Sequence, residues 1–353
     1  MTATVSALPA ALTAALDEVR VSVADLTATV FERKVTADNP RELQSLLASA
    51  LYDVLHAGMK GEPATLPRRL RDARLETDLA AAVPHAETTT RAVVCAMPEP
   101  PPVAVPPAEA EAGSAAHRVP GTGAETESRV LVLVDGLRVW APRDAIRTAG
   151  PPWAPGQEVT LAMSPARPAL SPGFFLVDGS AGSVASSRTL RVYVHLRDPR
   201  SAVAAWGRVL TLLEERRVRY RAKVLSAPVM YPRRDAIVVY LDSDGWTLLP
   251  ELAGAAADGP GVGDDVSVFC RRLGPGVAVA WEPEDDRPAM RGLSFGQHRA
   301  GVLARALLDS VREGVDRERK ILASFAESNI DPADPARNTT SPRVRSRDGV
   351  ILL

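Results

Sequence analysis

The segment that decides the fold is Arg191–Tyr240, which reads RVYVHLRDPRSAVAAWGRVLTLLEERRVRYRAKVLSAPVMYPRRDAIVVY. Polar and apolar residues alternate in Arg191–Leu196 and again in Arg219–Leu225, and this alternation is typical of strands with one buried face. Between these strands, Asp198 and the proline that follows it open a helix with an apolar stripe. Another strand is predicted at Ala236–Leu241. The pattern indicates a sheet that is covered on one side by a helix.

The flanking regions complete an α+β fold, in which a mainly antiparallel or mixed sheet and packed helices form one domain. Short strand-like runs broken by Gly, Pro and Asp begin at residue 129, so we place this domain at residues 129–328. Its last element is a long helix from Ser294, where Gln297 has the spacing of a capping box. Residues 329–353 are polar and contain Pro and Arg, and we expect them to form a disordered tail.

The first part of the chain reads as a separate helical domain, residues 1–97. Its clearest helix begins at Pro40, after a cap at Asp38 or Asn39. Residues 98–128 are rich in Pro, Ala and Glu and have no periodicity. They cannot bury enough apolar surface to offset the entropy of ordering, so a flexible linker or insertion is predicted there.

The composition excludes several classes of protein. The chain has 353 residues, a net charge of −1 and 46% hydrophobic residues, which is ordinary for a soluble globular protein and argues against a general binder of nucleic acid or anionic membranes. The sequence contains neither a signal peptide nor an apolar run that could span a bilayer, and we expect a cytoplasmic protein. Cys95 and Cys270 stand far apart and predict neither a disulfide framework nor a cysteine metal site.

The polar faces of the two strands are the candidate functional surface. Successive side chains of a strand point to opposite sides. One polar set is therefore Arg191, Tyr193 and His195, and the other is Arg219, Arg221 and Lys223. Such an arginine-rich surface could be a solvated sheet edge that blocks aggregation, a phosphate cradle, or a nucleic-acid backbone site. The neutral net charge and the few aromatic residues disfavour the third reading.

Lys223 stands out because only four of the 42 basic residues are lysines. Arginine stays protonated and is a poor base, whereas a lysine among other cations can release its proton. His195, on a polar strand face, is the candidate acid. A base, an acid and arginines suit β-elimination of phosphate from phosphoserine or phosphothreonine, which needs neither metal nor nucleotide. No zinc-protease or Walker motif is present, and we expect no metal and no cofactor.

The same segment resembles the HopA-type effector-like family found in actinobacterial peptide-modifying gene clusters. The matching parts are the strand with Tyr193 and His195, the Lys-Val-Leu strand, the run from Tyr231 to Tyr240, and the later segments LGPGVAVAWEP and SFGQHRAGVLARAL. The resemblance covers about residues 129–315. Such proteins are distantly similar to phosphothreonine lyases of the OspF and SpvC type.

The resemblance implies a role in class V lanthipeptide and thioamitide pathways. There a separate kinase-like protein phosphorylates Ser or Thr of a precursor peptide, and the HopA-like partner eliminates phosphate to give dehydroalanine or dehydrobutyrine. Carried over, Lys223 matches the base, His195 the acid, and Arg233 and Arg299 the phosphate ligands. The phosphothreonine lyases have a lysine where this chain has Tyr193. Arg191 or Arg221 would then have to offset the enolate charge.

Several alternatives stay open at this point. Tyr231 and Tyr240 are either core residues or substrate contacts. A non-catalytic scaffold that binds phosphorylated precursor for a kinase or a cyclase would share the arginines but would not need Lys223. A nucleic-acid-binding module is the third alternative, and its affinity would depend steeply on salt. We expect the phosphorylated precursor and the kinase-like protein as partners, and neither nucleic acid nor membrane.

Overall fold

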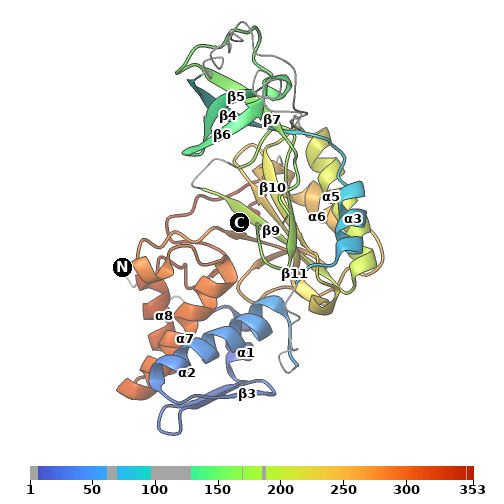
Figure 1. Cartoon of the computed structure of the whole chain (residues 1–353). Helices are drawn as coiled ribbons and strands as arrows, with labels where there is room; N and C mark the ends of the chain where they lie inside the picture. The colour runs from blue at the N-terminus through green and yellow to red at the C-terminus, as the bar shows by residue number, and fades with distance from the viewer. Residues whose placement is uncertain (1–6, 62–69, 97–128, 169, 185–187, 347) are drawn as a thin grey trace, which may run out of the picture. The chain divides into compact units, whose positions relative to one another are not determined.

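The computed structural model describes residues 7–61, 70–96, 129–168, 170–184, 188–346 and 348–353 (Figure 1). The fold is α+β with three antiparallel sheets, which confirms the predicted class. The chain forms two compact units. The larger unit contains residues 1–86 and 166–353, and the smaller unit contains residues 87–165. The predicted linker, residues 98–128, lies outside the described residues.

A six-stranded antiparallel sheet forms the centre of the larger unit, with strand order β12-β13-β9-β11-β10-β8. Its strands are β8 (Phe174–Asp178), β9 (Leu190–Leu196), β10 (Tyr220–Leu225), β11 (Arg233–Leu241), β12 (Arg271–Gly274) and β13 (Val277–Trp281). The helices α5 (Pro199–Glu215) and α6 (Leu249–Ala257) pack on one of its faces (Figure 1). The strands and the covering helix predicted from Arg191–Tyr240 are therefore confirmed.

Local chemistry explains where α5 begins and which side it buries. The Asp198 carboxylate accepts a hydrogen bond from the Ser201 N–H at 2.9 Å, and Pro199 occupies the first turn, where no intrahelical N–H partner is needed. Trp206 and Leu210 lie on the buried stripe of the helix. This stripe meets the apolar side chains of the strands, so the polar side chains are left on the opposite face of the sheet.

The N-terminal segment does not form a separate helical domain, and this prediction was wrong. After α1 (Ala10–Leu16), a three-stranded sheet contains β1 (Val19–Ser22), β2 (Thr27–Val30) and β3 (Arg33–Thr36). Val and Thr are frequent in these residues, and such β-branched side chains favour strands over helices. The buried residues of this segment belong to the same core as the central sheet.

A helical layer joins the N-terminal and C-terminal parts of the larger unit. The helix α2 (Pro40–Leu51) continues into a π-helical turn, Tyr52–Ala57, and packs against α7 (Phe295–Glu313). Gly314, at φ 63°, ends α7 in a left-handed conformation, so α8 (Arg317–Glu327) is a separate helix. The short α3 (Ala73–Ala81) packs on α5.

The last residues are not a disordered tail, and this prediction was also wrong. Ile330, Ala336, Val344 and Leu353 are buried and belong to the core of the larger unit. The polar residues between them are hydrogen-bonded, as in the contact from the Arg337 side chain to the carbonyl oxygen of Ser341. Four widely spaced apolar anchors are enough to order a segment whose overall composition is polar.

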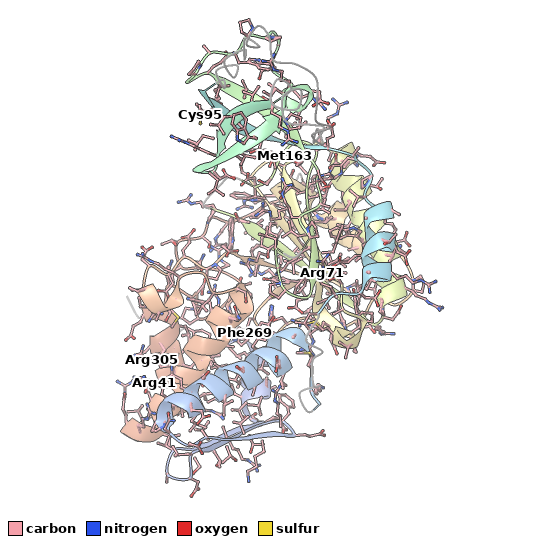
Figure 2. The ribbon with its side chains drawn as sticks, in the orientation of Figure 1. Arg41, Arg71, Cys95, Met163, Phe269 and Arg305 are labelled. Atoms are coloured by element: carbon pink, nitrogen blue, oxygen red, sulfur yellow. The ribbon has the colours of Figure 1, made fainter. Side chains whose placement is uncertain are left out.

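The smaller unit is a four-stranded antiparallel sheet of order β6-β5-β4-β7 with its own buried cluster. Its strands are β4 (Thr88–Ala96), β5 (Arg129–Val134), β6 (Leu137–Pro142) and β7 (Glu158–Met163). Cys95 and Met163 lie on two of these strands (Figure 2). The predicted domain boundaries at residues 97 and 129 therefore fall within this unit. Among the described residues, no helix combines the length and apolar character that a membrane span requires.

Candidate functional site

A cavity of about 760 Å³ opens on the polar face of the central sheet. Side chains of β9, β10 and β11 line it, together with residues of the π-helical turn, the loop at residues 282–286 and the start of α7. The residues that later arguments use are Tyr52, His56, Phe174, Arg191, Tyr193, Lys223, Asp235, Tyr240, Glu282, Asp285, Arg291, Ser294 and Gly296.

Strand register brings two rows of side chains together on the floor of this cavity. Tyr193 pairs with Val238, which on its other side pairs with Lys223. In the next row, Arg191 and Arg221 both pair with Tyr240. Directly paired residues point to the same side of a sheet. The predicted juxtaposition of Arg191, Tyr193 and Lys223 on one face is therefore confirmed.

Lys223 is a cation of this floor that makes no ion pair with any described residue, although its charge helps to lower the pKa of Asp235 in the same cavity. Its Nζ lies 4.3 Å from the centroid of the Phe174 ring. Within the described ranges of the chain, Nζ has neither a hydrogen bond nor an ion pair. A half-buried amine that is held by an aromatic ring and faces a cavity has its hydrogen-bonding capacity available for a ligand.

The four arginines predicted as charge or phosphate ligands all have partners in the protein. Arg191 binds Glu282 with two nitrogens, and Arg221 Nε lies 2.7 Å from Asp178 Oδ1. Arg233 binds Asp235 at 2.7 and 2.8 Å, and Arg299 is fully buried beneath the C-terminal segment. Arg191 lines the cavity, whereas the cavity lining among the described residues does not include Arg233 or Arg299.

Tyr231 and Tyr240 differ in their position relative to the cavity. The Tyr231 hydroxyl donates to the carbonyl oxygen of Leu225 at 2.8 Å, away from the cavity lining. Tyr240 lines the cavity, and its ring centroid lies 5.0 Å from the Arg191 guanidinium carbon. Tyr193 is buried in the floor, and no described residue hydrogen-bonds to its hydroxyl. Such an unsatisfied buried group marks a place where a ligand or water would bind.

His195 does not line the cavity in the described structure. Its Nδ1 lies 3.0 Å from the carbonyl oxygen of Asp265, and burial lowers its pKa. The histidine that lines the cavity is His56, from the π-helical turn. Its ring packs edge-on against Tyr193 at 5.2 Å, and its Nε2 lies 4.0 Å from Asp235 Oδ2.

The surroundings of His56 hold its ring neutral and fixed. Nδ1 lies 2.9 Å from the Ser267 hydroxyl oxygen, and burial lowers the pKa of His56 to about 4. Gly296, in the first turn of α7, is needed for this packing. A Cβ at that position would lie 2.8 Å from His56 Nε2 and closer still to Cδ2. Short π-helical segments such as the one carrying His56 occur frequently at functional sites.

Residues 165–337 match the model of the HopA1 effector protein family. This part, here called the HopA1 region, makes up just under half of the chain and is similar to that family. It contains the whole central sheet, Lys223 and α7, so the floor of the cavity lies within the HopA1 region. Tyr52 and His56 lie outside the matched residues. The N-terminal segment therefore supplies a wall that the family match does not cover.

Two solved structures of effector proteins from Pseudomonas syringae are similar to this chain. For the protein of pathovar syringae strain 61, the identity is 18%, the TM-score is 0.36, and the match covers 49% of this chain and 63% of that chain. For the protein of pathovar tomato strain DC3000, the identity is 18%, the TM-score is 0.38, and the coverages are 47% and 62%. The matches span less than two thirds of either effector. A comparison with curated proteins finds no match.

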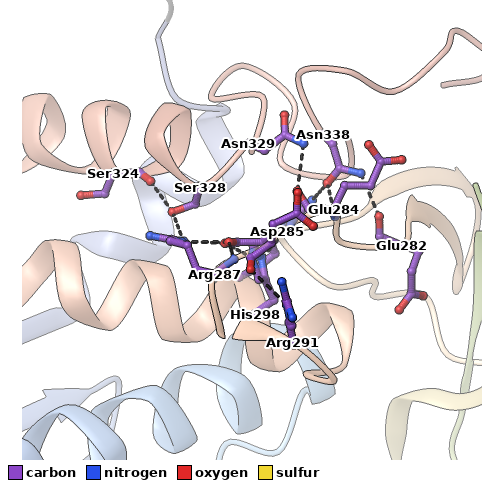
Figure 3. A network of polar contacts seen from close by, with 12 residues as sticks. Glu282, Glu284, Asp285, Arg287, Arg291, His298, Ser324, Ser328, Asn329 and Asn338 are labelled. Atoms are coloured by element: carbon purple, nitrogen blue, oxygen red, sulfur yellow. Dashed lines mark hydrogen bonds and ion pairs between the residues drawn. The ribbon is translucent and has the colours of Figure 1, made fainter. Parts of the chain in front are cut away.

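The acidic loop of the HopA1 region is held by a polar network (Figure 3). His298 Nε2 lies 2.8 Å from Asp285 Oδ2, and Arg287 also binds Asp285. Arg299 donates to His298 Nδ1, so the remaining proton of a neutral His298 ring is on Nε2, facing the carboxylate. Contacts with Arg287 and His298 hold the pKa of Asp285 far below its usual range. These contacts fix Asp285 and pair its charge, whereas Glu284 and Asp286 also line the cavity and make no ion pair with any described residue.

A second set of contacts ties this loop to the C-terminal segment. The Asn329 amide donates to the Glu284 carbonyl oxygen at 2.9 Å, and the Asn338 amide donates to the Glu282 carbonyl oxygen at 2.8 Å. Arg287 donates to the Ser328 hydroxyl at 2.7 Å. Residues after 328 therefore shape the cavity wall, although they do not line the cavity themselves.

We expect the protein to lose stability as the pH falls from about 6.5 to 4. Burial lowers the pKa of both His56 and His298 from 6.5 to about 4, so in this range the unfolded chain takes up protons that the folded protein does not. The free energy of unfolding should fall by on the order of 1.4 kcal/mol per pH unit for each histidine. Urea unfolding between pH 7.5 and 4.5 measures this slope.

The matched variant for this prediction is His298→Gln. It removes one of the two depressed groups, so its stability should depend less steeply on pH, whatever its stability at pH 7.5. An unchanged slope would show that His298 is not held neutral in the folded protein.

Proposed function

We propose that this protein removes phosphate from phosphoserine or phosphothreonine in a peptide by β-elimination, leaving dehydroalanine or dehydrobutyrine. The observation that carries this proposal is the Lys223 amine, which has no ion pair among the described residues and lines the same cavity as Tyr193, a buried tyrosine whose hydroxyl has no hydrogen-bond partner among them. An amine placed in this way can act as a base toward a substrate held in the cavity.

The elimination requires a base that removes the Cα proton and an acid that protonates the departing oxygen. Lys223 takes the Cα proton, the C–H electrons form the Cα=Cβ bond, and the Cβ–O bond breaks with its electrons on oxygen. His56, in place of the predicted His195, donates a proton to the departing oxygen. The charge of a bound phosphoryl group favours the protonated imidazole. The proton then passes from Lys223 to His56, directly or through water, which restores both residues to their starting protonation states. The released product is hydrogen phosphate.

Phosphate binding is supported by the start of α7 and by Arg291. The capping box of Ser294 and Gln297 uses two N–H groups of that turn, and the N–H groups of Phe295 and Gly296 lie between them in sequence. Helix N-termini attract anions through such groups and the helix dipole. Arg291 lines the same part of the cavity. Because Arg191 and Arg287 bind Glu282 and Asp285, these two carboxylates repel a phosphoryl group less than free ones would.

The proposed substrate class rests on the resemblance to the HopA-type family of peptide-modifying gene clusters. The proposal includes a ribosomal precursor peptide that a separate kinase-like protein phosphorylates in the cytoplasm, with a cyclase as a further partner during lanthipeptide-type maturation. Elimination creates an electrophilic alkene, which a thiol of the same peptide can attack. A kinase must therefore act before this protein, and cyclisation follows it.

The test is mass spectrometry of a synthetic phosphothreonine peptide incubated with the purified full-length protein alone. We expect the peptide to lose the mass of one phosphoric acid. A phosphatase would instead restore the threonine, and the product would be heavier by one water. An unchanged peptide that nevertheless binds the protein would reject the lyase and support the non-catalytic scaffold.

A further inference from the structure

A second hollow of about 390 Å³ adjoins the cavity on the same face of the sheet. The two share Arg191, Lys223, Tyr240, Ser171 and Glu282 as lining residues. The remaining lining residues of the second hollow are Leu170, Leu176, Val184, Thr189 and Arg221. The hollow is therefore continuous with the proposed active site at the residue proposed as the base.

Strand register fixes the spacing between two rows of side chains that contribute to both hollows. Leu176 pairs with Lys223, while Asp178 pairs with Arg221 in the next row. Rows on the same face are two residues apart, which is about 7 Å along a strand. An extended peptide also places every second side chain on one side, at the same spacing. If its phosphorylated residue lies at Lys223 in the first cavity, the side chain two positions away reaches the row of Arg221, which lines the second hollow but not the first.

The walls of the second hollow suit an apolar side chain. Leu170, Leu176 and Val184 supply aliphatic surface, and Tyr240 supplies an aromatic ring. Apart from Lys223, the charged residues of the hollow are paired: Arg191 binds Glu282, and Arg221 binds Asp178. With Lys223 engaged at the phosphorylated residue, a charged substrate side chain entering here would lose water without gaining a further unpaired opposite charge.

We infer that this hollow is a specificity pocket for an apolar residue two positions from the phosphorylated residue of the substrate peptide. The inference rests on the proposed elimination, because the phosphorylated residue defines the register. It adds a sequence preference that the chemistry at Lys223 does not require.

The experiment compares phosphothreonine peptides that carry Leu, Ala or Asp two positions before or after the phosphothreonine. Competition within one reaction, followed by mass spectrometry, gives the ratio of kcat/KM values. We expect Leu to be preferred over Asp by roughly tenfold or more on one side of the phosphothreonine, with Ala between them. Equal ratios on both sides would overturn the inference and leave the lyase intact, whereas no elimination of any peptide would overturn both.

A charge change in the pocket links the preference to this hollow. Leu170 is 61% exposed, so Leu170→Arg should fold, and it should shift the ratio toward the Asp peptide at least severalfold. Val184→Arg should also shift the ratio toward the Asp peptide. The same shift in both variants would show that the effect does not depend on residue 170 alone. The matched control is Leu137→Arg, an exposed leucine of the smaller unit, which should keep the wild-type ratio. If neither pocket variant changed the preference for Leu over Asp, the residue that the protein recognises would not bind in the second hollow.

Discussion

Lys223→Arg should lower the rate of phosphate elimination by roughly 10²–10⁴-fold while phosphopeptide binding persists. Arginine keeps the positive charge, and its guanidinium can also stack on the Phe174 ring that Lys223 contacts. It stays protonated at any pH at which the protein is folded, so it cannot take the Cα proton. The measurements are the elimination rate by mass spectrometry and the affinity for a fluorescent phosphopeptide by anisotropy.

The matched control for this variant is Lys60→Arg. Lys60 also lies over an aromatic ring, that of Phe31 at 5.8 Å, but it does not line the cavity. This control should eliminate phosphate at the wild-type rate. Wild-type activity in Lys223→Arg would reject Lys223 as the base, and loss of both binding and activity would assign it a binding role instead.

Arg299→Met should destabilise the protein by about 3–5 kcal/mol. The buried guanidinium donates to the carbonyl oxygen of Pro335 at 2.8 Å, to that of Arg337 at 3.3 Å and to Asn338 Oδ1 at 3.1 Å. Methionine fills much of the volume but leaves these acceptors and His298 Nδ1 without a donor. The measurement is the free energy of unfolding from urea titration at pH 7.5.

The same helix provides the control, Arg305→Met. Arg305 lies on α7, has a side chain that is 58% exposed, and pairs with Asp309 across one turn at 3.6 Å (Figure 2). Exposed pairs of this kind contribute about 0.3–0.5 kcal/mol, so the control should remain close to wild type. Equal losses in the two variants would mean that the guanidinium of Arg299 does not anchor the C-terminal segment.

The sequence was sufficient for those features that depend on local pattern. Alternation in β9 and β10 predicted which side chains share a face, and the cap at Asp198 predicted where α5 begins. From these two facts, Lys223, Tyr193 and Arg191 were placed on one surface. The structure adds that this surface is the floor of a cavity.

The roles of the arginines could not be predicted from local sequence pattern. Whether an arginine binds a ligand or a carboxylate of its own chain depends on residues distant in sequence, as for Arg191 with Glu282 and Arg221 with Asp178. His56 was missed for the same reason, since nothing near it in sequence indicates that it packs on Tyr193. Its position in a short buried segment before Gly58 was the only local signal.

The π-helical turn also constrains how this protein is made. Tyr52 donates to Asp235, a residue 183 positions later in the chain, and Arg317 reaches back 301 positions to the carbonyl oxygen of Leu16. At about 5–20 residues per second, a ribosome needs on the order of ten to forty seconds to synthesise Asp235 after Tyr52. During that interval the apolar stripe of α2 has no α7 to cover it. Assembly of the cavity is therefore a late event in synthesis, and the nascent N-terminal segment is a natural client for chaperones.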